Sequence, residues 1–485
     1  MHRAVSADGG SKRERRVRAE RQECERRLSR EDDMNEGHRI TGAGAAAVLA
    51  DLGFAAVASG VIARRRPVMG LLERTRADRR ALARIRQLRL RFGSGPVELV
   101  LPGRRVVVVL DPDDVGTVLR GAPAPFHPAS REKVAALRQF QPHGVLISDG
   151  PVRARRRAVN EAVLDTDAPM HRLAEPFAET IAEEAGGFID AAVRRGQAGA
   201  GEFITGWWQV VRRLVLGSAA RDDDAITDEL WRLRSAANWS FLVPPRRRQR
   251  DRFTARLYRY VEDAPPDSLA GALKQVPGEG AVDPVGQIPH WLFAFDAAGI
   301  ALTRAVALLA THPRQRARAM SDAADPARPD LRQYLRACML ESVRLWPTTP
   351  IILRELTDDT TWRDGDDSFA LAPDATVLIT VPAFHRDPDL VPFANEFVPE
   401  VWLDGRAERY PQLVPFSGGP AVCPGRNLVL FTTGTLLAHL LHALEFRLVS
   451  QPRPTPDEPL PLTFNNFGLS FAVTRAVPSI ASPGR

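Results

Sequence analysis

A single cysteine lies in the segment of the chain that is best suited to chemistry. Residues 416–428 read FSGGPAVCPGRNL, with Cys423 among three glycines and two prolines, directly before an apolar run. If that run is a helix, its N-terminus presents free backbone N–H groups and a partial positive charge, and both features lower a thiol pKa. The spacing therefore predicts a stabilised thiolate at Cys423. The alternative is a buried structural cysteine beside a turn.

An acidic residue interrupts the most apolar helix that the pattern predicts. Residues 288–311 form a long apolar run that contains Asp296 and Gly299 and is followed by Pro313. A buried carboxylate without a partner is costly, so an acid inside such a helix points to function. Ala297 comes next and has no side-chain group that can donate a proton. The alternative for Asp296 is a hydrogen-bonded helix residue, with Gly299 permitting a local kink.

Two further pairs of charged residues have helical spacing. Glu341 and Arg344 lie three apart in a helix that is predicted to end before Pro347, so they can form an ion pair. Arg153 and Arg157 lie four apart and share a helix face, and guanidinium groups bind carboxylates through two parallel hydrogen bonds. The alternative for these arginines is an exposed basic patch that contacts a redox partner.

The elements that position these residues are predicted to be mainly helical. Periodicity is helical over residues 150–346 and 426–444, whereas short strands are predicted at 351–356 and 376–381 and a hairpin at 97–110. Of 485 residues, 44% are hydrophobic, which allows a large core, and three cysteines are too few for a disulfide framework. The fold class is therefore predicted to be mainly α with minor β.

The first 66 residues are expected to form an extension that precedes a domain at residues 67–485. Residues 1–33 are rich in Arg and Glu without apolar periodicity, which predicts disorder, and Met34 is an alternative start. Residues 43–64 form a weakly apolar helix whose central Asp51 opposes insertion into a membrane by about 2.5–3.5 kcal/mol. We expect contact with a membrane surface without spanning, and a cytoplasmic location, because the first apolar stretch lies too deep for a secretory signal.

The cysteine loop resembles the heme-binding loop of the cytochrome P450 superfamily, and in particular that of its bacterial-type heme-thiolate monooxygenases. The resemblance implies the P450 fold, in which heme b (iron protoporphyrin IX) lies between a long distal helix and the helix after the cysteine loop. It implies that Cys423 is the iron ligand, that Phe416 packs beside it, and that Gly419 and Gly425 shape the loop. Ala421 departs from the family pattern, which usually has His or Arg there to face a heme propionate.

The charged pairs also match motifs of this family. Glu341-Ser-Val-Arg344 resembles the E-x-x-R helix, which implies a structural role. The arginine that usually completes this motif is absent from the segment Pro399-Glu400-Val401-Trp402, and Arg406 is the proposed substitute. By the same resemblance, three arginines face the heme propionates: Arg153, Arg157 and Arg354.

The apolar helix at 288–311 resembles the distal helix of the family. Asp296 takes the position of the conserved acid, and Ala297 replaces the threonine whose hydroxyl usually orders the proton relay. By resemblance, the substrate pocket is lined by Phe293, Phe295, Ile351 and Phe467, which predicts an apolar pocket.

The function implied is insertion of one oxygen atom from O2 into a small apolar organic substrate. Electrons are expected from an acidic ferredoxin-type donor, with its NAD(P)H reductase, that docks on the face beside Cys423, where Arg426 and exposed arginines of the 153–157 helix complement its charge. No nucleic-acid partner is expected. Because Ala297 cannot donate a proton, a heme-thiolate peroxygenase or another non-monooxygenase P450 is the alternative, and a heme-binding sensor or carrier is a third hypothesis.

Overall fold

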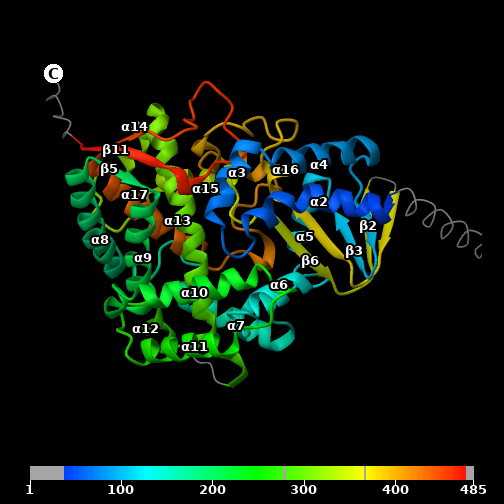
Figure 1. Ribbon diagram of the computed structural model, residues 1–485, viewed down its shortest axis with the longest axis horizontal. Helices are drawn as coiled ribbons and strands as arrows, with labels where there is room; N and C mark the ends of the chain where they lie inside the picture. The colour runs from blue at the N-terminus through cyan, green and yellow to red at the C-terminus, as the bar shows by residue number, and fades with distance from the viewer. Residues whose placement is uncertain (1–37, 277–279, 365–366, 477–485) are drawn as a thin grey trace, which may run out of the picture.

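The structure is a computed structural model that describes residues 38–276, 280–364 and 367–476. The predictions for residues 1–33 and Met34 lie outside the described residues. The described chain is mainly helical, with a larger helical part beside a smaller part built on a six-stranded sheet (Figure 1). The predicted fold class is confirmed.

The helical part is arranged around α13 (Ile288–Thr311), which crosses the middle of the molecule (Figure 1). This helix has Pro289 in its first turn and ends before Pro313, so its bounds are those that the sequence predicts. It packs against α9, α15 and α17. The other helices of this part are α7 (Gly150–Leu164), α8 (Ala174–Arg195), α9 (Ala200–Leu216), α10 (Asp224–Ala237), α11 (Arg247–Glu262), α12 (Leu269–Leu273), α14 (Pro313–Asp322), α15 (Gln333–Leu345) and α17 (Arg426–Ala443).

The main sheet has the strand order β1-β2-β3-β9-β6-β4. Its strands are β1 (Arg39–Thr41), β2 (Val97–Leu101), β3 (Arg104–Val108), β4 (Phe126–His127), β6 (Ile351–Leu356) and β9 (Thr376–Thr380). The predicted hairpin is confirmed, because β2 and β3 pair antiparallel with Val97 opposite Val108. Two small sheets contain β5 (Gln197–Gly199), β10 (Leu444–Leu448) and β11 (Ser470–Arg475) in one, and β7 (Thr360–Asp364) and β8 (Asp367–Leu371) in the other.

The boundary that we expected between residues 66 and 67 is wrong. Strand β1 pairs parallel with β2, and α2 (Gly42–Ser59) packs on α4 (Arg79–Phe92) and on the sheet. The small residues on the inner face of α2 allow this close approach, and they include the fully buried Ala45. The core therefore extends to the beginning of the described chain. The remaining short helices are α3 (Arg66–Thr75), α5 (Pro112–Arg120), α6 (Arg131–Leu137) and α16 (Val381–His385).

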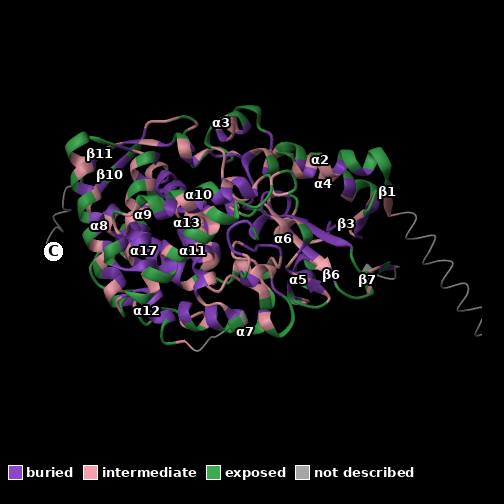
Figure 2. Cartoon of the chain, turned by 60° about the horizontal axis from the view of Figure 1, so that its bottom comes forward, coloured by how far each residue is buried: buried purple, intermediate pink, exposed green. Residues whose placement is uncertain are grey.

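Two described helical segments are long and apolar enough to cross a membrane by length and composition. The segment 285–311, which includes α13, is 78% buried inside the fold and is the central core helix. Helix α2 is only 22% buried and leaves most of its outer face exposed (Figure 2).

Candidate active site

The cysteine loop leads from Pro415 into α17 and folds back on itself. The Cys423 N–H donates to the Phe416 carbonyl oxygen at 3.0 Å, and Phe416 packs against the main hydrophobic core. Cys423 itself is half-buried, two residues before Gly425, which caps α17. The sulfur therefore lies at the N-terminus of a long apolar helix, as the sequence predicts.

The two loop glycines have different roles. Gly419 has φ +60°, and a Cβ on it would lie 2.1 Å from the Leu119 carbonyl oxygen, so only glycine fits there. A Cβ on Gly425 would meet only Leu164, at an ordinary contact distance of 3.8 Å. Gly425 instead acts through its backbone N–H, which donates to the Cys423 sulfur.

The thiol pKa differs from the sequence prediction. Burial raises the pKa of the Cys423 thiol, although the Gly425 N–H and the nearby charges of Arg157 and Arg426 act to lower it. The prediction of a lowered pKa is wrong for this structure, because desolvation penalises the thiolate more than these groups stabilise it.

Arg157 on α7 braces the cysteine loop. Its Nη1 donates to the Val422 carbonyl oxygen at 2.8 Å, and its Nε donates to the Glu161 carboxylate at 2.6 Å. Thr166, two residues after the end of α7, also holds the loop, because its Oγ1 donates to the Pro424 carbonyl oxygen. The charge of Arg157 is thus shared with Glu161, and its role toward a propionate stays a prediction.

A cluster of cations without a carboxylate partner lies near this loop. Arg153 is 9% exposed and Arg354 is 4% exposed, and within the described residues neither forms an ion pair. The Nε atoms of both are buried without a hydrogen-bond partner in the same set. Burial, followed by the charge of Arg153, lowers the pKa of Arg354 to about 10. Two desolvated guanidinium groups close together, with no anion between them, form a site for an anionic group.

Lys133 and His127 belong to the same cluster and were not found from the sequence. Lys133 Nζ donates to the carbonyl oxygens of Pro128 and Leu353, and burial lowers its pKa strongly. The pKa of His127 is also lowered, first by burial and then by Arg153. Neither residue stands in a recognisable motif, and only the fold brings them beside Arg354.

Asp296 is held by an arginine from another helix. Its carboxylate accepts from Nη2 of Arg234 on α10 at 2.8 Å, and the same Nη2 donates to the Ile62 carbonyl oxygen. Arg234 is 3% exposed, and its guanidinium lies 4.5 Å from the centre of the Phe293 ring. The acid therefore has a buried partner. Ala297, one residue later, is partly exposed on an otherwise largely buried helix.

Glu341 and Arg344 form a fully buried ion pair, as their spacing predicts. Arg344 Nη2 donates to Glu341 at 2.8 Å and to the Glu396 carbonyl oxygen at 2.8 Å. The carboxylate also accepts from Trp402 Nε1 at 3.0 Å. Arg406 instead pairs with Asp404 at the surface, so its proposed role as the substitute arginine is wrong. Trp402, one residue after Val401 in the segment that lacks the family's arginine, supplies a further contact to Glu341.

Comparison with known proteins agrees with this geometry. The sequence model of the family described as "Cytochrome P450" matches residues 299–470, which include the buried ion pair and the cysteine loop. A crystal structure of a cytochrome P450, CYP102L1, superposes with a TM-score of 0.65 at 19% identity, over 82% of this chain and 94% of that chain. Residues 299–470 thus match the cytochrome P450 family, and the chain has the cytochrome P450 fold.

Sequence similarity to characterised P450s is restricted to part of the chain. Cytochrome P450 52A4 of Candida maltosa is 33% identical over 26% of this chain and 24% of its own length. Cytochrome P450 71A18 of Arabidopsis thaliana is 35% identical over 31% of this chain and 29% of its own length. The chain thus matches only about a quarter of the length of these relatives.

The residues of this P450 fit the cofactor of the family. Heme carries two propionate carboxylates, and the unpaired guanidinium groups of Arg153 and Arg354, with Lys133, supply positive charge for them. Cys423 supplies a single sulfur donor at a helix N-terminus. Ala421 provides no polar contact, and Arg153 and Arg354 supply the charge instead.

Replacing Arg153 and Arg354 together with methionine is expected to weaken heme retention. Each of the two substitutions removes a charge-assisted hydrogen bond to a heme propionate, which is worth about tenfold in heme affinity. The apoprotein should become more stable, because two uncompensated buried charges are removed. Heme transfer to a scavenger protein measures the first effect and urea unfolding of the apoprotein the second. Arg155→Met, an exposed position on the same helix, is the matched control, and equal transfer rates for both variants would contradict the assignment.

The four residues predicted to line the substrate pocket fall in different places. Phe467 lines a pocket of about 870 Å³ that also reaches Asp296. Phe293 is partly exposed and lies edge-on to Phe140, and Ile351 is partly exposed in β6. Phe295 is 2% exposed and packs on Trp207 of α9, so its prediction as a pocket residue is wrong. The helical phase of α13 turns this ring toward α9, where it fills the core.

Proposed function

We propose that this P450 is a heme-thiolate monooxygenase that inserts one oxygen atom from O2 into an organic substrate. The observation that carries the proposal is the half-buried Cys423 at the start of α17, beside buried cations that no carboxylate of the described chain neutralises. When bound through a thiolate, heme iron activates oxygen, because the thiolate donates electron density that favours O–O cleavage.

The protein side chains hold and orient the parts of this site. Arg157 and the Gly425 N–H fix the cysteine loop and place positive charge beside the sulfur. Arg153 and Arg354 supply the buried positive charge that would bind the propionate carboxylates. Asp296 is the proton-delivering acid of the proposal, and it can act only after its carboxylate turns from Arg234 toward the distal site.

One feature favours a second function. Ala297 offers no hydroxyl to order a proton relay, and the adjacent Asp296 is engaged with Arg234. An enzyme that uses hydrogen peroxide receives both oxygen atoms already reduced and protonated, so it needs less of this machinery. A heme-thiolate peroxygenase is therefore the alternative function.

A turnover assay with two oxidants separates these functions. The holoprotein is incubated with a substrate found by spin-state titration, either with O2, ferredoxin, its reductase and NAD(P)H, or with hydrogen peroxide alone. Product from the first mixture but not from the second supports the monooxygenase. Product from peroxide alone identifies the peroxygenase, and heme binding without turnover in either mixture contradicts both.

Asp296→Asn is expected to lower O2-dependent turnover about 100-fold, the usual contribution of a positioned general acid. Turnover with peroxide should change little, because that oxidant brings its own protons. The measurement is the ratio of the two rates in the variant and in the wild type. Asp228→Asn, an exposed position that lines the same pocket, is the control, and equal losses with both oxidants would contradict a role in proton delivery.

The electron donor is proposed to be an acidic ferredoxin-type protein that docks beside the cysteine loop. Arg426 and Arg155 are exposed there and supply positive charge, whereas Arg153 and Arg156 are buried and do not. Of the arginines in the 153–157 stretch, Arg155 is therefore the one available for docking. The surface supports attraction of a negatively charged partner at low ionic strength.

Contact with a membrane surface is a further part of the proposal. The exposed apolar residues Phe54, Val57 and Val61 lie on or just after α2, and Phe241 and Leu242 are exposed in the loop after α10. Asn238 accepts from the N–H groups of Ile62 and Ala63, so these two segments are neighbours. Arg65 and Arg66 flank them, which suits an interface with anionic lipid without a spanning segment.

A further inference from the structure

A pocket of about 870 Å³ lies on the Asp296 side of α13, outside the cysteine site. Its walls come from α9, α10, α13 and residues 63–67, with Phe467 from the loop before β11. Helices α9, α10 and α13 lie next to one another in the middle of the molecule (Figure 1). This volume is in the range of sites that bind small organic molecules.

The charges in this pocket are unevenly distributed. Arg212 pairs with Asp224 at 2.8 Å, and Arg234 pairs with Asp296, which leaves these two arginines neutralised. The arginines of residues 64–66 also line the pocket and form no ion pair within the described chain, although the charges of Asp296 and Asp78 act on Arg64 and raise its pKa against the effect of burial. Five arginines and three aspartates line the pocket, which therefore carries an excess of positive charge.

The contacts of these three arginines are all with neutral groups. Arg64 donates to Ser59 Oγ at 2.7 Å and to the Thr348 carbonyl oxygen at 2.7 Å. Arg65 lies 4.6 Å from the centre of the Trp239 ring, and Arg66 lies 5.4 Å from that of Phe467. Their positive charges are thus held in place and remain available to an anion.

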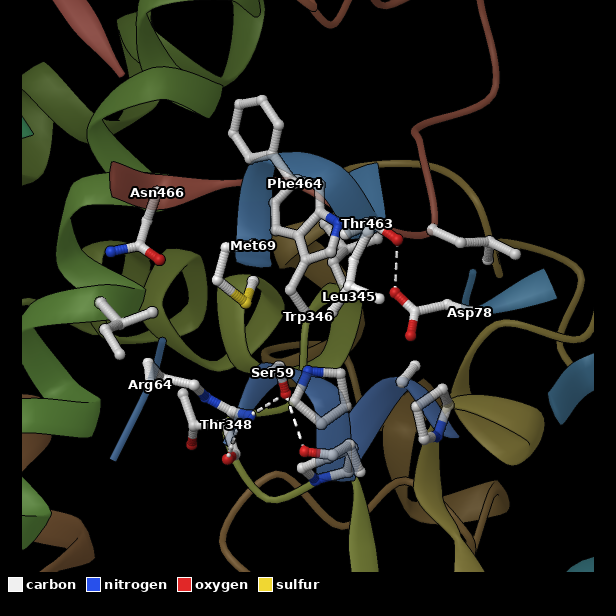
Figure 3. A pocket seen from close by; sticks show the side chains of 18 of the residues that line it. Ser59, Arg64, Met69, Asp78, Leu345, Trp346, Thr348, Thr463, Phe464 and Asn466 are labelled. Atoms are coloured by element: carbon white, nitrogen blue, oxygen red, sulfur yellow. Dashed lines mark hydrogen bonds between the residues drawn. The ribbon is translucent and has the colours of Figure 1, made fainter. Parts of the chain in front are cut away.

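Arg64 stands between this pocket and a smaller inner one. The inner pocket has a volume of about 70 Å³ and is lined by Trp346 and Phe464, and Arg64 and Ile300 line both pockets. Figure 3 shows Arg64 with its hydrogen bonds to Ser59 and Thr348 at one side of this inner pocket.

One buried polar atom in the wall of the large pocket lacks a hydrogen-bond partner. Arg234 is 3% exposed, and its Nε has no hydrogen-bond partner within the described residues, although its Nη2 binds Asp296. The buried guanidinium can therefore donate one further hydrogen bond. An anionic group beside Arg234 satisfies this donor, which the protein leaves unpaired.

The remaining walls are aromatic. Trp208, Trp231 and Trp239 line the pocket with Phe467, and Trp231 and Trp239 are each 50% exposed. Half-exposed indole rings that face a cavity bind flat apolar groups by stacking and by burial of their faces. A ligand with an aromatic body gains more from these walls than a small inorganic anion does.

We propose that this pocket binds an aryl carboxylate, with its carboxylate at the arginines of residues 64–66 and its ring against the tryptophans. Guanidinium groups suit the carboxylate, because they form two parallel hydrogen bonds to it. The inference goes beyond the proposed function, because the pocket lies on the Asp296 side of α13, outside the cysteine site.

Calorimetric titration of the purified holoprotein tests the proposal. The probes are 2-naphthoate and its neutral analogue 2-naphthylmethanol, which share the ring system. We expect 2-naphthoate to bind at least about tenfold more tightly, and this difference to shrink at high salt. Equal affinities for the two probes, or no binding of 2-naphthoate, would overturn it.

Variants locate the binding site. Arg66→Gln is expected to weaken 2-naphthoate binding about tenfold, because one charged hydrogen-bond donor is lost, and this exposed side chain makes no contact on which folding depends. Arg64→Gln tests the inner end of the pocket. Arg246→Gln, an exposed arginine outside the pocket, is the matched control. If Arg66→Gln and Arg64→Gln both bind 2-naphthoate as the control does, the assignment is wrong.

Failure of this proposal is distinguishable from failure of the proposed function. Heme binding and the spectrum of the reduced, carbon-monoxide-bound protein depend on Cys423 and not on the arginines of residues 64–66. A protein with the thiolate spectrum but without carboxylate preference therefore rejects the ligand class alone.

Discussion

Cys423→Ser is expected to remove the thiolate signature from the spectrum of the reduced, carbon-monoxide-bound protein and to lower O2-dependent turnover roughly a thousandfold or more. Serine is close to cysteine in shape, so it can still accept from the Gly425 N–H. Its hydroxyl stays protonated at neutral pH and is a poor iron ligand. The loop should keep its fold, because the Cys423 N–H to Phe416 carbonyl bond belongs to the backbone.

The control for this substitution is the other cysteine in the described part of the chain. Cys338 lies fully buried in α15, and burial raises its thiol pKa far above the usual value, so it is a packing residue. Cys338→Ala should leave the spectrum unchanged, with a modest loss of stability. An unaltered heme spectrum in Cys423→Ser, or imidazole ligation in the wild-type holoprotein, would contradict the assignment of the Cys423 thiolate as the iron ligand.

The bounds of the central helices followed from local signals in the sequence. Pro289 and Pro313 fix the ends of α13, because proline is tolerated in the first turn of a helix and ends a preceding one. The spacing of Glu341 and Arg344 and the glycines around Cys423 are also local patterns. Each is recognisable without knowledge of what packs against it.

The errors came from contacts between distant parts of the chain. The pKa of Cys423 depends on how deeply the fold buries the loop, and this overrides the helix N-terminus that the sequence shows. Arg234 meets Asp296 across 62 positions, and Trp402 meets Glu341 across 61. Arg234 stands in no recognised motif, and the segment that contains Trp402 was noted only for its missing arginine. Periodicity therefore located the acidic groups, but it did not reveal which residues bind them.

In the N-terminal region, the sequence also failed to reveal contacts with distant parts of the chain, and a core helix was taken for an extension. Residues 43–64 are only weakly apolar and contain Asp51, which favoured an extension rather than part of the core. The structure buries Ala45, Val48 and Leu52 against α4 and the sheet, because small side chains let the helix approach closely. Weak apolar character thus reflects an alanine-rich packing surface here and not the absence of packing.

Glu341→Gln is expected to destabilise the fold by about 3–5 kcal/mol, the usual cost of leaving one charge of a buried ion pair without its partner. Both side chains are fully buried, so water cannot solvate the Arg344 guanidinium that remains. The carboxylate also accepts from Trp402 Nε1 and from the Val398 N–H, and glutamine replaces one of its two acceptor oxygens with a donor.

Urea unfolding of the wild type and the variant measures this loss, and Asp404→Asn is the matched control. Asp404 also pairs with an arginine, Arg406, but both side chains are 42% exposed, so its removal should cost much less stability than loss of the buried pair. If the two variants are equally stable, the buried pair does not hold the segment around Trp402 in place.

Because Arg344 also donates to the His385 and Glu396 carbonyl oxygens, loss of the pair should loosen the chain that leads to the cysteine loop. We therefore expect Glu341→Gln to lower heme retention as well as stability, although the residue lies outside the proposed heme contacts.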